Sequence, residues 1–193
     1  MFIKKGLKCL LIFSTFLQGP TLFSQSKFHP YAGLHASMNG DGFYVGPSYQ
    51  AGTDYQLEKK VVLSFYAHYF PCKVNDIFDG LSESGKYKSL TTALLLQTHL
   101  SKKTGKGIFA GLGLAFQRVS ENYEREDFYK EHYKENMLVG AFRFGYLFSF
   151  SGYGLAIELN GTGPHTTKDR DTGDIEKIQL LTQLSLGARF ILY

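Results

Sequence analysis

Tryptophan is absent from this chain of 193 residues, and proline occurs only five times. Beyond the N-terminal stretch there is also no apolar run of about 20 residues, which excludes a membrane-spanning helix there. The formal net charge is only +4, and the basic residues form no stripe with aromatic residues between them, so nucleic acid is not an expected partner. The chain is rich instead in Tyr (13), Phe (17) and Gly (21). These residues suit strands, membrane interfaces and tightly curved barrel walls, so the composition favours a β-barrel.

The first residues have the layout of a secretory signal peptide. Lysines precede an apolar stretch over residues 9–17, and a polar end follows it. This pattern predicts a signal peptide over residues 1–25, cleaved near Ser24 or Gln25, and a mature domain over residues 26–193. The apolar stretch is shorter than the roughly 20 residues of an uncleaved membrane anchor.

Cysteine and aspartate give little support for a disulfide or a metal site. Cys9 leaves with the signal peptide, so Cys72 has no partner and a cysteine-based metal site is not expected. Asp169, Asp171 and Asp174 match a calcium-binding loop only in part, because the glycine is misplaced and no closing Glu has the required spacing. The sequence therefore predicts no metal and no other cofactor.

The last sixteen residues, 178–193, alternate between two kinds of side chain. Gln179, Gln183, Ser185 and Arg189 share one parity, while the other parity is almost wholly apolar. Successive side chains of a strand point to opposite faces, so the pattern predicts a strand with one apolar and one mixed face. In a membrane barrel the apolar face meets lipid and the mixed face lines the lumen. Segments of this kind cover residues 28–39, 43–57, 61–70, 88–101, 107–118, 137–150, 153–161 and 178–193.

The lengths of these segments and of their connectors indicate the fold class. Most segments have about 9 to 15 residues, enough for a tilted strand to cross a bilayer. The second, fourth and sixth connectors are short, whereas residues 71–87, 119–136 and 162–177 form long polar connectors. Short turns at one end and long loops at the other are typical of outer-membrane barrels. The sequence predicts an all-β fold, an eight-stranded antiparallel up-and-down transmembrane β-barrel, whose interior side chains just fill it.

A family resemblance agrees with this fold. The eight-segment pattern, the opening FHPYAGLHASMN and the ending LGARFILY resemble the small outer-membrane β-barrel proteins of Gram-negative bacteria, the OmpA/OmpX-like and PorT-like group. The resemblance covers roughly residues 28–193 and implies location in the cell outer membrane, contact with its lipid, and recognition of the last strand by the barrel-assembly machinery. The closing Tyr193 departs from the family pattern, because it is one position out of phase with Phe190.

Polar residues on the mixed faces form a candidate network in the lumen. Arg143, Glu158 and Arg189 lie on the last three segments, at positions that allow contact. An ion pair inside a barrel satisfies charges that cannot face lipid. Two interpretations are open, packing of the lumen or a path or gate for ions or protons, and the small interior of eight strands favours packing. Asp54, Gln97 and Gln183 are expected in the network, and Gln50, His68 and His99 extend it.

A hydrolase hypothesis rests on His35 and Ser37. Lipid A deacylases built on eight-stranded barrels use a His and a Ser two positions apart, late in the barrel and facing the membrane. Here the pair lies on the first segment, and its parity turns both side chains inward. A His-activated Ser also needs an orienting carboxylate.

The sequence thus predicts a non-enzymatic, porin-like barrel with a structural or surface-interaction role, whose long outer loops meet a protein or another surface ligand. Tyr123, Phe128, Tyr129 and Tyr133 are placed to extend the strands outward or to form a contact patch. Three alternatives remain open: a membrane-embedded lipid A acyl hydrolase, an accessory barrel of a secretion or assembly machine, as PorT-like proteins are, and a soluble lipocalin-like ligand carrier. The carrier would require polar outer faces.

Overall fold

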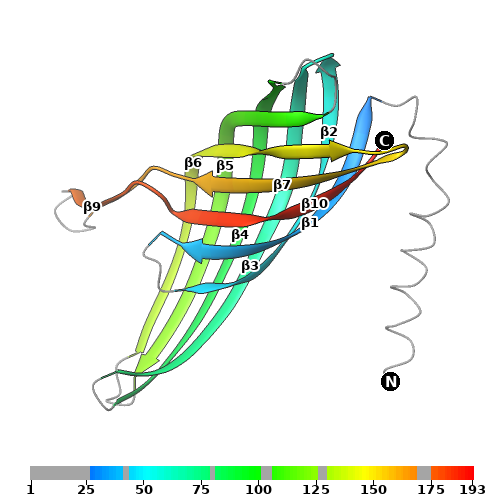
Figure 1. Cartoon of the computed structure of the whole chain (residues 1–193). Coiled ribbons are helices and arrows are strands. Elements are labelled where there is room, and N and C mark those ends of the chain that lie inside the picture. The colour runs from blue at the N-terminus through cyan, green and yellow to red at the C-terminus, as the bar shows by residue number, and fades with distance from the viewer. Residues whose placement is uncertain (1–26, 41–43, 79–80, 101–105, 126–129, 169–174) are drawn as a thin grey trace, which may run out of the picture.

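The computed structural model describes residues 27–40, 44–78, 81–100, 106–125, 130–168 and 175–193. Within them, eight strands close an antiparallel barrel in the order β1-β10-β7-β6-β5-β4-β3-β2 (Figure 1). The barrel strands are β1 (Phe28–Asn39), β2 (Val45–Glu58), β3 (Val61–Phe78), β4 (Leu81–His99), β5 (Gly107–Arg125), β6 (Lys130–Ser149), β7 (Tyr153–Thr162) and β10 (Gln183–Leu192). The predicted fold class is confirmed, whereas the predicted signal peptide lies outside the described residues.

The barrel strands follow an up-and-down course, and the first and last of them close the wall. β1 pairs with β10 from Tyr31↔Ile191 to Asn39↔Gln183. Two further strands, β8 (His165–Lys168) and β9 (Ile175–Gln179), form a separate two-stranded sheet between β7 and β10. No helix in the described part of the chain is long and apolar enough to cross a membrane.

The two ends of the barrel differ. The end that holds Phe28 and Tyr193, here called the turn end, carries the short connections after β2, β4 and β6. The opposite end, here called the hairpin end, carries the long β3–β4 and β5–β6 hairpins and the β8–β9 sheet, which reach toward the lower left and left of Figure 1. Strands of unequal length therefore give the molecule one compact end and one extended end.

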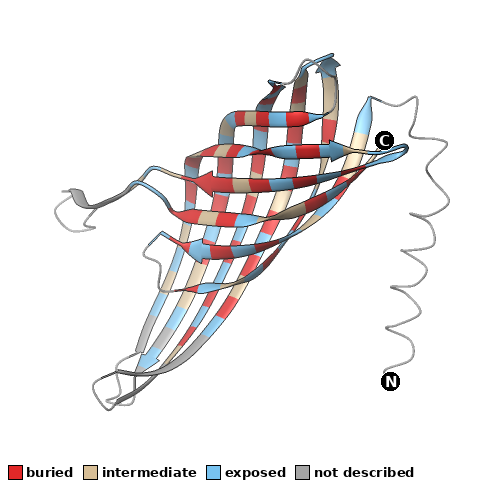
Figure 2. Ribbon diagram, in the orientation of Figure 1, coloured by how far each residue is buried: buried red, intermediate tan, exposed pale blue. Residues whose placement is uncertain are grey.

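Burial alternates along the strands, as the sequence parity predicts. In β1 the even-numbered residues from Ala32 to Met38 are exposed, whereas His35, Ser37 and Asn39 are buried. Figure 2 shows the same alternation of buried and exposed residues around the barrel wall. The polar parity lies inside and the apolar parity outside, which is the reverse of a soluble barrel and the arrangement found in barrels surrounded by lipid.

The prediction of long connectors over residues 71–87 and 119–136 is wrong. β3 continues to Phe78 and β4 begins at Leu81, with unbroken register between them. β5 continues to Arg125 and β6 begins at Lys130 in the same way. Outside a membrane both faces of a strand can be polar, so the alternation that marks the lipid-crossing part disappears although backbone pairing continues.

The start of the last strand is also corrected. The sequence pattern begins it at residue 178, but β10 begins at Gln183. Ile178 pairs instead with Thr166 of β8, in the sheet outside the barrel. Leu180 and Leu181, between β9 and β10, are exposed. The alternation of polar and apolar residues over 178–193 therefore comes from two separate strands, β9 and β10, whose patterns continue one another in the sequence.

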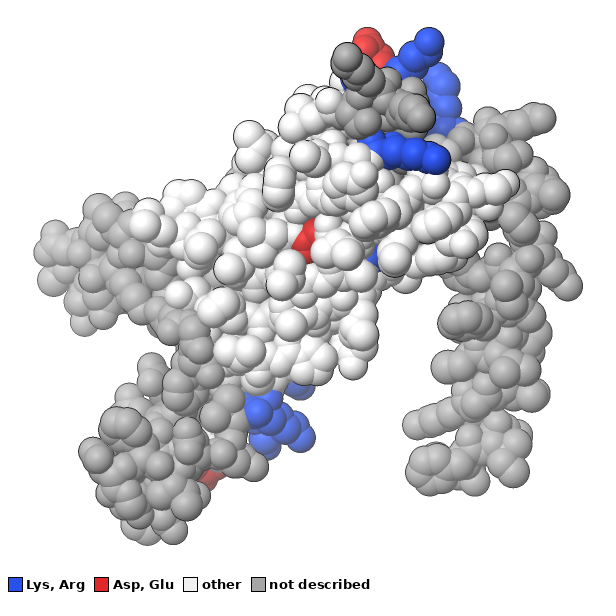
Figure 3. Space-filling view, in the orientation of Figure 1, with Lys and Arg blue, Asp and Glu red and all other residues white. Residues whose placement is uncertain are grey.

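The outer wall of the barrel is apolar. Leu112 is 73% exposed and Leu138 is 70% exposed, values that a water-facing monomer rarely shows for many large apolar residues together. Rings touch one another near the turn end, including Phe150 with Tyr153 at 4.9 Å and Tyr153 with Phe190 at 5.4 Å between centroids. In Figure 3 the middle of the visible face is almost free of charge, and lysine and arginine atoms gather toward its two ends. An apolar wall with an aromatic border is the surface that a bilayer requires.

Candidate functional site

Four charged side chains meet inside the barrel. Arg189 Nε lies 2.6 Å from Glu158 Oε2, and Arg189 Nη1 donates to Asp54 Oδ2 at 2.9 Å. Arg143 Nε lies 3.7 Å from Glu158 Oε1. The side chains of Arg143, Arg189 and Glu158 are 0% exposed. Two guanidinium groups and two carboxylates balance in charge, so the cluster is neutral as a whole.

Glycine on the neighbouring strands makes room for this cluster. Glu158 of β7 is paired with Gly145 of β6 on one side and Gly187 of β10 on the other. A Cβ atom at Gly145 would lie 2.7 Å from the ring of Phe109 and 2.9 Å from the Cβ of Glu158. A Cβ atom at Gly187 would overlap the carbonyl oxygen of Leu34 and lie 2.5 Å from the Cα atom of His35, so a side chain there would displace β1 from β10.

Neutral groups complete the coordination of Arg143. Its three guanidinium nitrogens donate to Asn160 Oδ1 at 2.9 Å, to Ser64 Oγ at 2.9 Å and to the Tyr31 hydroxyl at 3.1 Å. The ring of Tyr66 lies below the guanidinium, 4.5 Å from Cζ to the centroid. Hydrogen bonds in the plane of the guanidinium and an aromatic ring against its face together replace the water that would surround an exposed arginine.

Arg189 has a similar environment nearer the turn end. Its Nη2 donates to Gln97 Oε1 at 3.4 Å. The rings of Tyr31 and Phe109 lie 4.5 Å and 5.3 Å from its Cζ atom. Gln50, with its amide turned to suit both neighbours, donates to Glu158 Oε1 and accepts from Arg143 Nη2, each at 3.0 Å. Side chains from all eight barrel strands, including Phe109 of β5, thus meet across the lumen.

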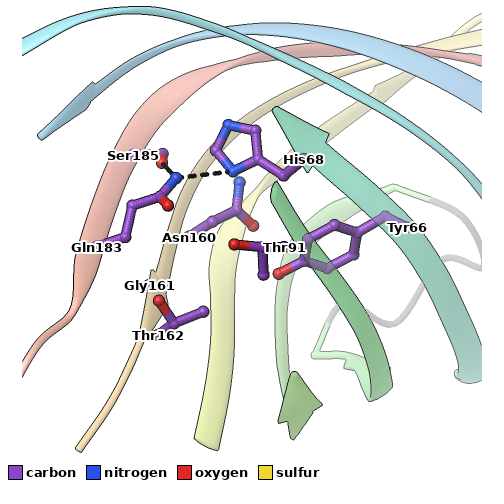
Figure 4. A pocket seen from close by; sticks show the side chains of 8 residues that line it. All are labelled: Tyr66, His68, Thr91, Asn160, Gly161, Thr162, Gln183 and Ser185. Carbon is purple, nitrogen blue, oxygen red and sulfur yellow. Dashed lines mark hydrogen bonds between the residues drawn. The ribbon is translucent and has the colours of Figure 1, made fainter. Parts of the chain in front are cut away.

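A second, uncharged layer lies beyond the charged cluster, toward the hairpin end. His68 Nε2 lies 2.8 Å from Ser48 Oγ, and Ser37 Oγ lies 2.5 Å from the same atom. His68 Nδ1 lies 3.1 Å from Gln183 Nε2, a contact drawn in Figure 4. A cavity of about 10 Å³ borders this layer beside Thr91, whose hydroxyl has no partner in the described structure. That volume suits about one water molecule.

Aromatic rings cover this layer at the hairpin end. Tyr44 and Tyr87 stack with centroids 4.9 Å apart, and Phe70 lies 5.4 Å from Tyr87. Next to them the Cys72 thiol donates to the carbonyl oxygen of Val45 at 3.3 Å. Burial raises the pKa of the Cys72 thiol, which keeps it protonated and unreactive. Charge, neutral hydrogen bonds and aromatic rings therefore follow one another along the lumen.

The comparisons with known proteins identify this arrangement at the level of fold. No protein-family model matches the chain, and no curated protein matches it. Among solved structures, Neisserial surface protein A, NspA, superposes with a TM-score of 0.60 at 10% sequence identity, over 86% of this chain and 97% of that one. This is the fold of the small outer-membrane β-barrels. Ail of Yersinia pestis, in a complex with the heparin analogue sucrose octasulfate, superposes with a TM-score of 0.52 at 8% identity, over 86% of this chain and 97% of Ail.

The structure of this barrel brings five of the six expected network residues together. Arg143, Glu158, Arg189, Asp54 and Gln97 form one connected cluster. The sixth residue, Gln183, belongs to the second layer. Its amide oxygen accepts a hydrogen bond from Ser89, and its amide nitrogen lies next to His68. Of the additional residues, Gln50 lies in the cluster, His68 in the second layer, and His99 beside Gln97 at 3.3 Å.

The two residues of the hydrolase hypothesis point to different partners in this barrel. His35 Nε2 lies 3.3 Å from Glu158 Oε1, inside the charged cluster. Ser37 Oγ lies 2.5 Å from Ser48 Oγ and 2.6 Å from Ser185 Oγ, and no hydrogen bond joins it to His35 among the described contacts. The pair therefore does not form a nucleophile and its base. The calcium-loop residues Asp169, Asp171 and Asp174 lie outside the described residues, and no three metal-binding side chains cluster within them.

Several residues that complete the network were not singled out from the sequence. Tyr31, Ser64, Tyr66 and Asn160 all have the inward parity, which was the available signal. Their role depends on which strands face one another across the lumen, and parity within one strand does not contain that information.

Proposed function

We propose that this protein is an outer-membrane barrel with a closed polar lumen that binds a partner at the cell surface through an extension of its wall. The extension, here called the projecting sheet, consists of residues 70–78, 81–89, 119–125 and 130–135 of β3, β4, β5 and β6, which lie in matching registers. One observation carries the proposal: these strands have 18 to 20 residues, whereas β7 and β10 have 10. A bilayer needs only about 9–11 residues, so the remainder projects as a paired, rigid sheet.

The edges of the projecting sheet support a binding role. β2 pairs with β3 only as far as Tyr69, and β7 pairs with β6 only from Ala141 onward. Beyond these points no barrel strand in the described structure covers the outer edge of β3 or β6; on β6 the segment after β7 contacts the edge at Gly140, through Gly163 N, and at Glu135, through His165 of β8. Unpaired N–H and C=O groups of an edge strand can accept an extended segment of another protein as an additional strand. The proposed ligand is therefore an extended protein segment.

A closed lumen fits this role better than transport. The charged cluster, the hydrogen-bonded second layer and the rings of Tyr44, Phe70 and Tyr87 occupy the interior in succession. Eight strands leave an interior that side chains just fill. The proposal includes the orientation typical of such barrels, with the turn end in the periplasm and the hairpin end outside.

The remaining alternatives are less well supported. The apolar outer wall is the opposite of the polar surface that a soluble lipocalin-like carrier needs. His35 and Ser37 have different hydrogen-bond partners, Glu158 and Ser48, which gives no support to a His-activated Ser of a lipid A acyl hydrolase. Membership of the OmpA/OmpX-like or PorT-like group, export by residues 1–25 and recognition of β10 by the barrel-assembly machinery remain part of the proposal. An accessory role in a secretion or assembly machine differs from the proposed surface binding chiefly in the side of the membrane on which the partner binds.

Photo-crosslinking in intact cells tests where the partner lies. A benzoylphenylalanine at His132, exposed on the β6 edge, is expected to give a protein adduct. The same group at Leu112, on the lipid-facing wall, is the matched control and should give no protein adduct. Lys60, in the turn after β2, reports on the periplasmic side. Adducts from Lys60 but not from His132 would contradict surface binding and favour the accessory barrel.

Planar bilayer recordings test the closed lumen. Because buried side chains occupy its length, the purified barrel is expected to produce no resolved conductance steps. A 16-stranded porin, whose lumen holds an aqueous channel, serves as the positive control in the same bilayer. Steady single-channel steps from this protein would overturn the closed lumen while leaving the projecting sheet unaffected.

A further inference from the structure

We propose that five basic side chains on the outside of β3–β6 form a binding site for the phosphate groups of lipid A in the outer leaflet. All five are exposed and belong to four neighbouring strands; they are Lys73, Lys86, Lys88, Arg118 and Lys134. The proposal rests on the orientation given above, with the hairpin end outside the cell. It adds a lipid-binding site to a barrel whose proposed protein partner binds elsewhere, along the edges of the projecting sheet.

Strand register places these residues in one compact cluster. Lys73 of β3 lies directly opposite Lys86 of β4. Lys88, two positions from Lys86, lies on the same face of β4. Ser120 of β5 is paired with Lys88 on one side and with Lys134 on the other. The cluster therefore spans the four strands within neighbouring registers.

Arg118 fills the remaining corner of this cluster. It shares the outward face of β5 with Ser120 and is paired with Leu90 and Asn136. Its position is diagonal to both Lys88 and Lys134, within reach of long side chains across an antiparallel sheet. Arg118 is thus the member nearest to the apolar wall.

Within its own registers the cluster carries charge of one sign, and among the described side chains the nearest acidic residue on the same face is Glu124, at the next outward position of β5 after Asn122. Between the registers of Lys73 and Arg118 the other outward residues with described side chains are Tyr69, Pro71, Leu90, Ser120, Asn122, His132 and Asn136. None of these is acidic. Lysines directly opposite each other, as in the Lys73–Lys86 pair, destabilise a sheet unless an anion lies between them. The arrangement therefore calls for an anionic ligand.

The position of the cluster identifies the anion as a lipid headgroup. Lys88 is the next outward residue after Leu90, and Arg118 is the next after Phe116, so basic residues follow directly on the lipid-facing apolar wall. Side chains of this parity point outward from the barrel and not into the lumen, so Lys88 and Arg118 lie beside the edge of the apolar wall and the other three residues lie just beyond it. At that level of the outer leaflet lie the phosphorylated sugars of lipid A. Clustered cations next to a hydrophobic span are the usual recognition device for anionic lipid headgroups.

Among the side chains that the structure describes, the cluster is confined to one side of the barrel. At the hairpin end of β1 and β2 the corresponding outward residues are Met38, Val45 and Pro47, which are exposed but uncharged. Lysines and arginines that only mark the membrane interface would be distributed around the barrel. A one-sided cluster instead fits a discrete bound headgroup with more than one phosphate.

Thermal unfolding in vesicles tests the proposal. The protein refolded in phosphatidylcholine vesicles is expected to unfold at a higher temperature when bis-phosphorylated lipid A is included, because a ligand of the folded state stabilises it. Dephosphorylated lipid A should give no rise. The triple variant Lys73→Gln, Lys86→Gln, Lys88→Gln should lose the rise, and the control variant Lys59→Gln, Lys60→Gln, at the turn end, should keep it. Arg118→Gln with Lys134→Gln is the second variant and should also lose the rise.

Three results would overturn the proposal. One is an equal rise with dephosphorylated lipid A, which would indicate a contact with acyl chains. Another is a full rise in both the triple variant and the Arg118→Gln, Lys134→Gln variant. The third is an equal rise with soluble pyrophosphate or heparin in place of lipid A, which would indicate a site for free anions. Crosslinking from His132 is unaffected by these results, so the surface-binding proposal stands or fails separately.

Discussion

Replacement of Glu158 by Gln is expected to destabilise the barrel by about 3–5 kcal/mol, the usual cost of breaking a buried ion pair from one side. Glu158 contacts Arg189 at 2.6 Å and Arg143 at 3.7 Å, and all three side chains are fully buried. Without the carboxylate, two guanidinium groups in the lumen would share Asp54 as their remaining counterion. The amide preserves size and shape, so the loss reports on charge.

The measurement must avoid tryptophan fluorescence, because the chain contains no Trp. Urea unfolding followed by far-ultraviolet circular dichroism, together with the mobility of unboiled samples in SDS gels, gives two independent readings. Asp54→Asn is the matched control: Asp54 contacts Arg189 alone and its side chain is 8% exposed. We expect a smaller loss for it, about 1.5–3 kcal/mol, as for a hydrogen bond to a charged group. Equal urea midpoints for Glu158→Gln and the unaltered barrel would show that the cluster does not stabilise the fold.

Much of the barrel follows from sequence parity. The two faces of a strand between lipid and a packed lumen lie in very different environments. The polarity of each side chain therefore indicates whether it faces inward or outward. Arg189 and Phe190 are neighbours in β10, and one is buried while the other is exposed. The same alternation of polar and apolar residues predicted β1 over residues 28–39, which are its bounds in the structure. The strength of the signal comes from the lipid, which tolerates no charge on the outward face.

The parts outside the lipid could not be predicted in this way. In residues 71–87 and 119–136 polar residues occur on both parities, for example Glu121 and Asn122 in β5, so hydrophobic periodicity no longer distinguishes a strand from a loop. The outward row from Arg118 to Asn122 is polar, yet β5 keeps its pairing with β4 and β6 through this region. Backbone pairing with a neighbour, which no single segment records, decides the structure there.

The network shows the same limit at the level of single residues. The proximity of Arg143, Glu158 and Arg189 could be predicted because their strands are adjacent near the end of the chain. The contacts of Arg143 with Tyr31 and Ser64 cross the lumen from β6 to β1 and β3. Such contacts depend on barrel diameter and strand stagger together. Sequence parity supplies the inward set of residues, and closure of the barrel selects the partners within it.

The second large effect is expected from a charge on the outer wall. Leu112→Lys should destabilise the barrel in a bilayer by about 2–4 kcal/mol, the cost of a basic residue near the bilayer midplane. Leu112 of β5 is 73% exposed and is paired with Leu96 of β4 and Phe142 of β6, in the middle of the apolar wall. A lysine there would lose its hydration without gaining a partner.

Leu180 provides a matched control for the Leu112 substitution. It is 79% exposed, slightly more than Leu112, but lies between β9 and β10 at the hairpin end and is not part of a barrel strand. Leu180→Lys is therefore expected to change the unfolding free energy by less than about 0.5 kcal/mol, as for an ordinary surface site. Urea titrations of both variants in the same lipid vesicles make the comparison. Two leucines of equal exposure should differ only if the surrounding solvent differs, so equal and small effects would place the wall in water and restore the soluble-carrier alternative.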